Sequence, residues 1–315
     1  MTRIYYASDV HGAEKLWRKF INAAPFYGAD VLVLGGDLTG KVMVPVVEQR
    51  PGRWEARVFG KAQKARGDEQ LHELERRIRF NGFYPVRCSS DDYVKLSTDD
   101  DYRDRTFKEA MRAELERWLE LGRDKLADTG VKCFVMPGND DEWDIDDVLE
   151  HASEPVVSCG ERVVRLDGYQ MLSCAWANPT PWDSPREAPE EELGEKLEKL
   201  AAELEPDVPS IFNLHCPPHD SGLDLAPELT EELRVVREGG EPRMVPVGSV
   251  AVREFIERHH PVLGLHGHIH ESRGATDIAG TLCVNPGSAY AEGVLDGVVV
   301  DLEGDRVVSH QLVSG

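Results

Sequence analysis

Five short apolar segments are spaced along the chain, and each runs directly into glycine, acidic, amide or histidine residues. In chain order they end at DVH (9–11), GGD (35–37), PGNDD (137–141), LHC (214–216) and GHIH (267–270). A continuous apolar run that stops at such residues is typical of a strand buried on both faces of a sheet. Open α/β sheets place their ligands beyond the carboxyl ends of these strands. The pattern therefore predicts an α/β fold with a polar site at one sheet edge.

The first 40 residues show the pattern as strand, helix and strand. The aromatic segment 3–8 predicts a strand, and Leu16, Phe20 and Ile21 recur at helical spacing within 13–24. Segment 29–40 then predicts a buried strand that ends in glycines. Later in the chain we expect hairpins over 162–175 and 296–312, a helix over 193–205, and a helix over 249–260 that begins at Ser249.

A stretch of different character lies between the second and third of these strands, at about 41–127. A hairpin is predicted around 50–52, and charged helices over 69–80 and 103–127, with an irregular acidic loop at 91–104 between them. We interpret this stretch as a mainly helical insertion within a single domain that spans 1–315. It is a lid, a dimerisation arm or a helical decoration without a functional role. A dimerisation arm would make the protein a homo-oligomer.

The composition limits the classes of partner. The chain has 58 Asp and Glu against 36 Lys and Arg, a formal net charge of −22, and such a surface repels polyanions. A nucleic-acid partner would need a local basic patch or bound cations. No basic leader with an apolar stretch opens the sequence, and no window approaches the roughly 20 apolar residues of a membrane span. Six scattered cysteines without a CxxC motif predict reduced core residues. We therefore expect a cytoplasmic protein without membrane association.

The ordered set of strand-end motifs resembles the calcineurin-like metallophosphoesterase superfamily. The pattern of that superfamily is D-x-H, G-D-x-x-G, G-N-H-[DE], H and G-H-x-H, and this chain has DVH, GDLTG, GNDD, LHC and GHIH in the same order. The segments PTPWDSPRE, LHCPPHDSGLD and NPGS are similar to a group of small prokaryotic phosphoesterases. The resemblance does not cover 41–127. It implies an α/β fold of two facing mixed sheets flanked by helices, with metal loops along one edge.

The resemblance also implies a binuclear metal site with seven ligands. They are Asp9, His11 and His270 at the first metal, Asn139, His215 and His268 at the second, and Asp37 between the two. The chemistry of the residues supports this set independently, because mixed imidazole and oxygen ligands suit Mn, Fe, Co, Ni or Zn. An all-oxygen set would indicate Mg or Ca instead. We expect two divalent transition-metal ions, with Mn as the first choice.

The implied activity is hydrolysis of a small phosphomonoester or phosphodiester by a hydroxide that bridges the two metals. A metal-dependent nuclease is a second hypothesis, against which the acidic composition argues. A third is a metal-bound scaffold with little or no catalysis, in which the insertion would be the interaction surface.

Four further residues are candidates for roles around the metals. In the superfamily the acidic residue at the position of Asp141 hydrogen-bonds the histidine of D-x-H, which would here orient His11. Asp140 stands where the superfamily has a histidine that contacts phosphate or protonates the leaving group. A protonated Asp140, His219 or His266 would have to supply that acid, and the departure favours diesters or activated esters. His219 is otherwise a surface histidine, and His266 a bystander whose side chain points away from the metals.

Overall fold

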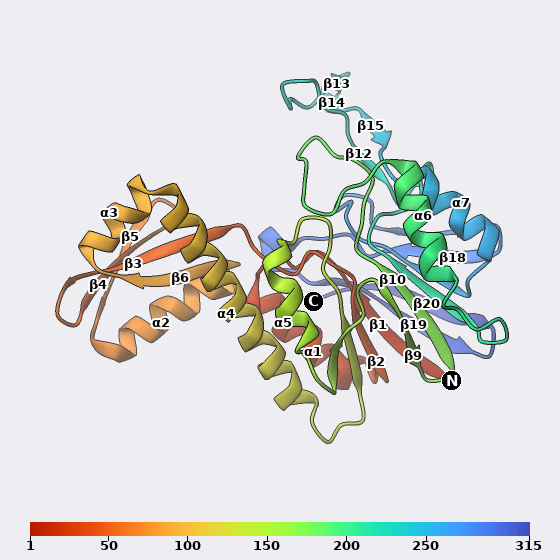
Figure 1. Cartoon of the computed structure of the whole chain (residues 1–315), viewed down its shortest axis with the longest axis horizontal. Coiled ribbons are helices and arrows are strands. Elements are labelled where there is room, and N and C mark those ends of the chain that lie inside the picture. Colours follow the sequence, from red (N-terminus) through yellow and green to blue (C-terminus); the bar gives the residue numbers. More distant parts are fainter.

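Two six-stranded β-sheets face each other in the centre of the molecule (Figure 1). The computed structural model describes all 315 residues. The first sheet has the order β20-β19-β1-β2-β7-β8, with strands β1 (Thr2–Ala7), β2 (Val31–Leu34), β7 (Lys132–Val135), β8 (Val156–Ser158), β19 (Asp296–Glu303) and β20 (Arg306–Ser314). The second has the order β17-β18-β16-β11-β10-β9, with strands β9 (Arg162–Leu166), β10 (Tyr169–Cys174), β11 (Ser210–Leu214), β16 (Leu263–Leu265), β17 (Gly274–Ile278) and β18 (Thr281–Asn285). The predicted fold of two facing mixed sheets is confirmed.

Apolar side chains from both sheets fill the space between them. Tyr6 and Val33 of the first sheet share one buried cluster with Met171 and Leu265 of the second. Every residue of β2 is buried, as the predicted two-sided burial requires. The predicted hairpins are also present as β9–β10 and β19–β20.

Helices cover the outer face of each sheet. On the first sheet lie α1 (Glu14–Tyr27), α4 (Asp100–Leu126) and α5 (Asp146–Glu150), and on the second lie α6 (Glu190–Ala201) and α7 (Val250–His259). The predicted cap is present at α7, where the Ser249 hydroxyl accepts from the Val252 amide at 3.1 Å. Trp17 of α1 stacks on Trp118 of α4 at 5.6 Å between ring centroids. This contact packs the long helix α4 against α1 on the first sheet.

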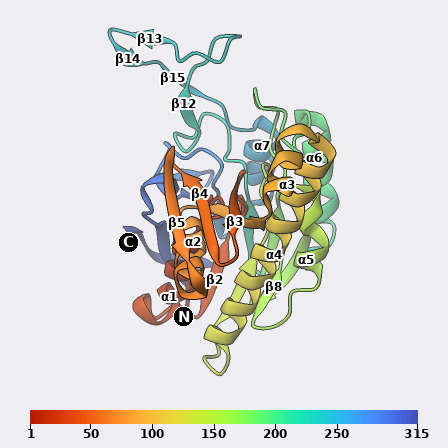
Figure 2. The same ribbon diagram turned by 90° about the vertical axis from the view of Figure 1, so that its left-hand side faces the viewer.

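The inserted segment forms a sheet of its own, to the left of the body in Figure 1. Its strand order is β5-β4-β3-β6, with β3 (Val42–Arg50), β4 (Arg53–Val58), β5 (Lys61–Arg66) and β6 (Phe83–Cys88), and with helices α2 (Gly67–Phe80), α3 (Ser90–Thr98) and α4. The predicted hairpin is confirmed as β3–β4, and helical residues outnumber strand residues. Figure 2 shows β3, β4 and β5 side by side, with α3 and α4 beside them.

The prediction of an irregular acidic loop at 91–104 was wrong. Residues 90–98 form α3, because the hydroxyl of Ser89 accepts from the Asp92 amide at 3.1 Å and the Asp92 carboxylate accepts from the Ser89 amide. This reciprocal pair satisfies two amides that a helix end otherwise leaves free. The next helix, α4, begins directly afterwards, with Asp99 as its cap. Acidic residues that suggested a loop are therefore the starts of two helices.

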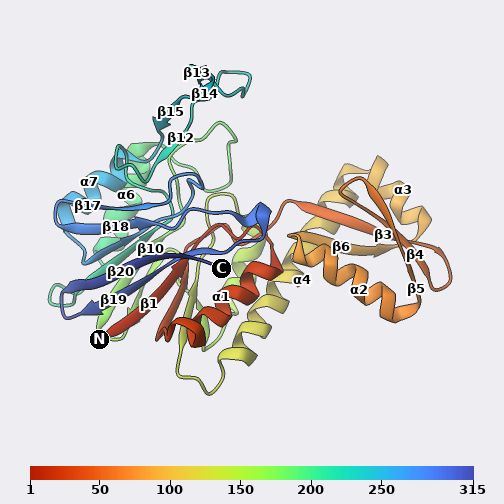
Figure 3. The ribbon, with the colours of Figure 1, turned by 180° about the vertical axis from the view of Figure 1, so that it is seen from behind.

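A narrow arm projects from the body near α6 and α7 (Figure 3). It contains β12 (Leu225–Pro227) paired with β15 (Met244–Pro246), and β13 (Arg237–Glu238) paired with β14 (Glu241–Pro242). All six cysteines are buried and free, as predicted for reduced core residues. None of the helices combines the length and the apolar character that crossing a bilayer requires.

Candidate metal centre

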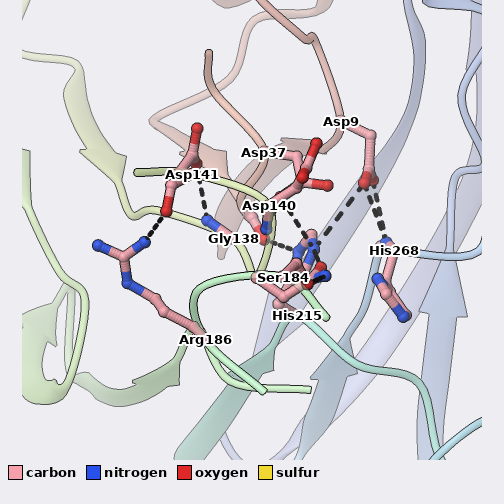
Figure 4. A network of polar contacts seen from close by, with 12 residues as sticks. Asp9, Asp37, Gly138, Asp140, Asp141, Ser184, Arg186, His215 and His268 are labelled. Carbon is pink, nitrogen blue, oxygen red and sulfur yellow. Dashed lines mark hydrogen bonds and ion pairs between the residues drawn. The ribbon is translucent and has the colours of Figure 1, made fainter. Parts of the chain in front are cut away.

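The five ligand-bearing loops meet because the strands before them are parallel neighbours. In the first sheet β1 pairs with β2 and β2 with β7 in parallel, and in the second β11 pairs in parallel with β16. Their carboxyl ends therefore share one edge of the facing sheets. The structure brings together at this edge all seven residues of the predicted ligand set: Asp9, His11, Asp37, Asn139, His215, His268 and His270. Asp9, Asp37, His215 and His268 are labelled in Figure 4.

The first group of donors consists of Asp9, His11, Asp37 and His270, whose ligand atoms all lie within 4.8 Å of one another. His270 Nε2 is 3.4 Å from Asp9 Oδ1, and His11 Nε2 is 3.7 Å from Asp37 Oδ2. Burial opposes ionisation of Asp9, but the hydrogen bond from His270 and the positive field of His215 outweigh it, so the pKa of Asp9 lies below its ordinary value. This group offers two carboxylates and two imidazoles to one cation.

The second group is built around His215, whose ring is fully buried. Its Nδ1 lies 2.9 Å from the carbonyl oxygen of Gly35, so Nδ1–H donates there and Nε2 faces the site. Nε2 is 3.0 Å from Asn139 Oδ1 and 3.4 Å from Asp37 Oδ1. Asn139 donates its amide hydrogen to Ser184 Oγ at 2.6 Å, which turns its oxygen toward His215. The His268 ring lies 5.4 Å from the His215 ring.

Burial and neighbouring charge act in opposite directions on these two rings. Burial lowers the pKa of His268 to about 4, so this ring is neutral and can act as a ligand at neutral pH. Burial also disfavours the charged form of His215, but Asp37 outweighs it and raises the pKa to about 9. A cation beside Asp37 would replace the proton that this carboxylate otherwise draws onto His215. The donor set of oxygen and imidazole atoms fits a divalent transition metal.

Several residues of the candidate ligand loops have a left-handed backbone conformation. Asp9, His11, Asp37 and His268 have φ values of 57°, 43°, 49° and 65°, a left-handed conformation that costs about 1–2 kcal/mol for most residues other than glycine. Hydrogen bonds between loops hold these conformations. The His268 amide donates to both oxygens of Asp9 at 3.1 Å, and the His11 amide donates to the Asp37 carbonyl at 3.0 Å. Such strain is characteristic of functional sites.

Asp141 has a different role from the one expected. It does not bond His11. Its carboxylate accepts from the amides of Leu38, Thr39 and Gly138 at 2.9, 2.8 and 2.8 Å. The physical reason is that the carboxylate is fully buried between the loop after β2 and the loop after β7, where these amides have no other acceptor. Asp141 therefore joins the loop of Asp37 to the loop of Asn139.

Asp140 lies at the solvent side of the centre, with its side chain 35% exposed. Its amide donates to Asp37 Oδ1 at 3.1 Å, and its Oδ2 is 4.0 Å from His11 Nδ1. Burial and the negative charge of Asp37 raise its pKa, although Lys41 opposes them. The Lys41 ammonium is 3.1 Å from Asp140 Oδ1 and also donates to the Asp140 carbonyl.

The two histidine candidates for the leaving-group acid lie apart from the ligands. His266 is fully buried, and its Nδ1 lies 2.9 Å from the carbonyl oxygen of Leu214 and 3.2 Å from that of Cys216. Burial lowers its pKa to about 4, so the ring is neutral. The side chain of His219 is 37% exposed, and its Nδ1 lies 3.8 Å from Asp224 Oδ2.

Several residues of the site carry no signal in the sequence. Lys41 is one, and Tyr290 is another, with its ring 4.4 Å from the His11 ring. Arg186 is fully buried. It donates from its backbone to the Asn139 carbonyl at 3.1 Å and from its guanidinium to the carbonyl of Asp141. Ser184 and Arg186 both belong to the segment PTPWDSPRE, one of the segments that carry the sequence resemblance described above. The similarity was thus the signal that could have indicated this contact.

The two facing sheets and the ligand loops along their shared edge define a metallophosphoesterase-like α/β fold with a candidate metal centre. TT1561 of Thermus thermophilus has a solved structure of this fold. Its TM-score to this chain is 0.54, with 15% identity, and the match covers 100% of this chain and 98% of that one. At this identity the likeness concerns the fold alone.

Two further proteins have similarity to this chain, one in sequence and one in structure. The uncharacterized protein MJ1162 of Methanocaldococcus jannaschii is 27% identical over 168 residues, which are 52% of this chain and 68% of that protein. The structure of a novel archaeal phosphodiesterase has a TM-score of 0.33 and 10% identity, with 99% of each chain covered, a likeness too low to inform on this chain. No protein-family model matches the sequence.

Proposed function

We propose that this protein is a binuclear metal-dependent phosphoesterase that hydrolyses a small phosphomonoester or phosphodiester. The observation that carries the proposal is the position of Asp37. One of its oxygens faces His11 Nε2 at 3.7 Å, and the other faces His215 Nε2 at 3.4 Å. A carboxylate that presents one oxygen to each of two donor groups is suited to lie between two cations.

Two bound divalent ions, with manganese as the first choice, would lower the pKa of a water molecule and neutralise phosphoryl oxygens. The chain holds the donors in place for them. Gly35 fixes the tautomer of His215, Ser184 orients Asn139, and Asp141 joins the loops that carry Asp37 and Asn139. Because donors are held before the ions arrive, little reorganisation accompanies binding.

Neither histidine candidate is well placed to protonate the leaving group. A neutral, buried His266 bonded to backbone carbonyls is poorly placed to protonate it, and His219 is engaged with Asp224. Asp140 remains at the solvent side, paired with Lys41. A site with this arrangement favours diesters or activated esters, whose leaving groups depend less on a strong acid.

The test is hydrolysis of an aryl phosphodiester and an aryl phosphomonoester by manganese-loaded protein. Asp37→Ala and His268→Ala should abolish turnover, whereas Asp144→Ala, at a partly exposed carboxylate outside the centre, should not. Full activity in the first two variants would exclude this site. Stoichiometric metal without turnover on a broad ester panel would favour the scaffold hypothesis.

A nuclease is the second candidate, and one observation favours it despite the acidic composition. On the sheet of the insertion α3 and α4 pack against β3 and β6. Beside these helices, on the same face of the sheet, strands β4 and β5 carry four exposed cations: Arg53, Arg57, Lys64 and Arg66. They alternate along the strands with the residues that pack on α2 at the opposite face. Their one ion pair is Lys64 with Glu55, at 3.7 Å. Cleavage of a single-stranded oligonucleotide, lost in Arg53→Glu/Lys64→Glu, would support this candidate over a small substrate.

A further inference from the structure

A single ammonium group stands among the acids and imidazoles of the metal centre. In the ion pairs of Asp9, His11, Asp37, Asp140, His215 and His270, every cationic partner is a histidine except Lys41. The side chain of Lys41 is 39% exposed and that of Asp140 is 35% exposed. Since Asp140 Oδ2 lies 4.0 Å from His11 Nδ1, this partly exposed pair borders the centre and is accessible to a solute.

The contacts of Lys41 leave one of its hydrogen-bond donors unused. An ammonium group has three N–H donors. One is directed at Asp140 Oδ1 at 3.1 Å, and another at the carbonyl of the same residue. Since Asp140 occupies two donors and no other protein group accepts from Lys41, the third is available to a ligand.

We propose that Lys41 is an anion-binding group of this site, and that its ammonium binds an oxygen of the phosphoryl group or of the leaving group. Asp140 is then a positioning residue, which directs Lys41 toward the centre and does not itself touch the substrate. This inference rests on the proposed phosphoesterase function. It gives the insertion a part in the site, because Lys41 directly precedes β3, the first strand of the inserted sheet.

Electrostatics supply the reason for such a cation. The bound ions would neutralise Asp9 and Asp37, but Asp140 adds a carboxylate at the solvent side of the centre, where an arriving phosphate brings further negative charge. A fixed ammonium opposite a phosphoryl oxygen forms a charge-assisted hydrogen bond. The position of Lys41 is held from the backbone, since the preceding Gly40 amide lies 2.6 Å from the Tyr84 hydroxyl and donates to it.

A purely structural ion pair leads to a different expectation. Exposed pairs contribute about 0–1 kcal/mol to stability, so a Lys41 that only neutralised Asp140 would leave phosphate affinity unchanged when it was removed. Anion binding is thus the readout that separates the two roles.

Inorganic phosphate is the probe. Its affinity for the manganese-loaded protein is measured by calorimetry and as the inhibition constant against an aryl phosphodiester. Lys41→Ala and Lys41→Met should weaken phosphate binding about 10- to 100-fold, the range for one hydrogen bond to a charged group. Lys41→Arg should retain most of the affinity. Lys125→Ala, which removes an exposed lysine near the end of α4, is the matched control and should change nothing.

Asp140→Ala should weaken phosphate binding less than Lys41→Ala, because it frees the ammonium but does not remove it. Phosphate affinity of Lys41→Ala and Lys41→Met within threefold of the parent would overturn the proposal. So would loss of bound manganese from both variants, since Lys41 would then be a structural residue. If the parent protein hydrolyses no ester, the phosphoesterase function fails, and the calorimetric arm still tests whether Lys41 binds phosphate.

Discussion

Replacement of Asp141 by asparagine tests how the two central loops are held. Oδ2 of this carboxylate accepts from the amides of Leu38 and Gly138, and Oδ1 accepts from the amide and the hydroxyl of Thr39. Asparagine has nearly the same size but only one acceptor oxygen. Whichever oxygen becomes the amide nitrogen, two donors lose their acceptor, and the charge is lost as well.

The expected magnitude follows from these contacts. A hydrogen bond to a charged group contributes about 1.5–3 kcal/mol, so the loss of two should lower the free energy of unfolding by about 3–6 kcal/mol. Because the loops carry Asp37 and Asn139, manganese affinity should fall as well. The assay is urea unfolding followed by circular dichroism, with chelator present so that bound metal adds no stability.

Asp144→Asn is the matched control. Asp144 is 36% exposed and pairs with Lys108 at 3.3 Å, so its replacement should cost about 0–1 kcal/mol. If Asp141→Asn shifts the urea midpoint no more than Asp144→Asn does, the conclusion that Asp141 holds the two loops together is refuted. A variant of parental stability that loses only the metal of the His11 group would instead restore the earlier expectation that Asp141 acts through His11.

Four further predictions concern the same molecule. Manganese should raise the melting temperature of the parent protein, by an amount equivalent to about 2.7 kcal/mol at one hundred times the dissociation constant, and should raise that of Asp37→Ala much less; equal shifts in differential scanning calorimetry would argue against the site. Gly138→Ala should abolish manganese binding in a folded protein, because its Cβ would overlap the Asp37 carboxylate; an unchanged metal content would contradict this. The pKa of His266 falls from 6.5 to about 4 on burial. Its contribution to the free energy of unfolding, at most about 3 kcal/mol, is therefore present above pH 6.5 and is lost as the pH falls toward 4. His266→Asn, which retains a donor for the Leu214 carbonyl, should flatten the dependence of stability on pH over this interval, and an unaltered slope would exclude the effect. The six buried cysteines should react with a thiol reagent only as fast as the protein unfolds, and rapid labelling without urea would show that a cysteine is accessible.

The polar residues at the strand ends were predictable because their signal is local, and the resemblance of their order to a known superfamily implied which of them are ligands. An apolar run that ends in glycine and a polar residue marks both a strand and its carboxyl end, and five such ends in one order leave few arrangements. The structure accordingly brings the seven residues to one sheet edge. The helix caps Ser89 and Asp99 and the acidic residues after them are local signals too, but 91–104 was interpreted as a loop because acidic residues also favour turns.

His266 shows where local reasoning stops. Alternation along an extended segment places it on the same side as His268 and His270, yet the strand β16 ends at Leu265 and His268 has a left-handed φ of 65°. Both features break the alternation, so His266 turns into the core while His268 faces the centre. The backbone conformation of His268 depends on its hydrogen bonds to Asp9, which lies 259 positions earlier in the chain.

By itself, the sequence determined the α/β class, the buried core strands and the types of donor at their ends, because strand burial and strand termination are properties of neighbouring residues. Tertiary structure alone decided the partners of Asp141, the pairing of Lys41 with Asp140, and the contact of Tyr290 with His11. These contacts join loops that are far apart in the chain, and they form only when the facing sheets bring the loop ends to one edge. Tertiary structure also decided that one oxygen of Asp37 faces His11 and the other faces His215, because these residues come from three different loops.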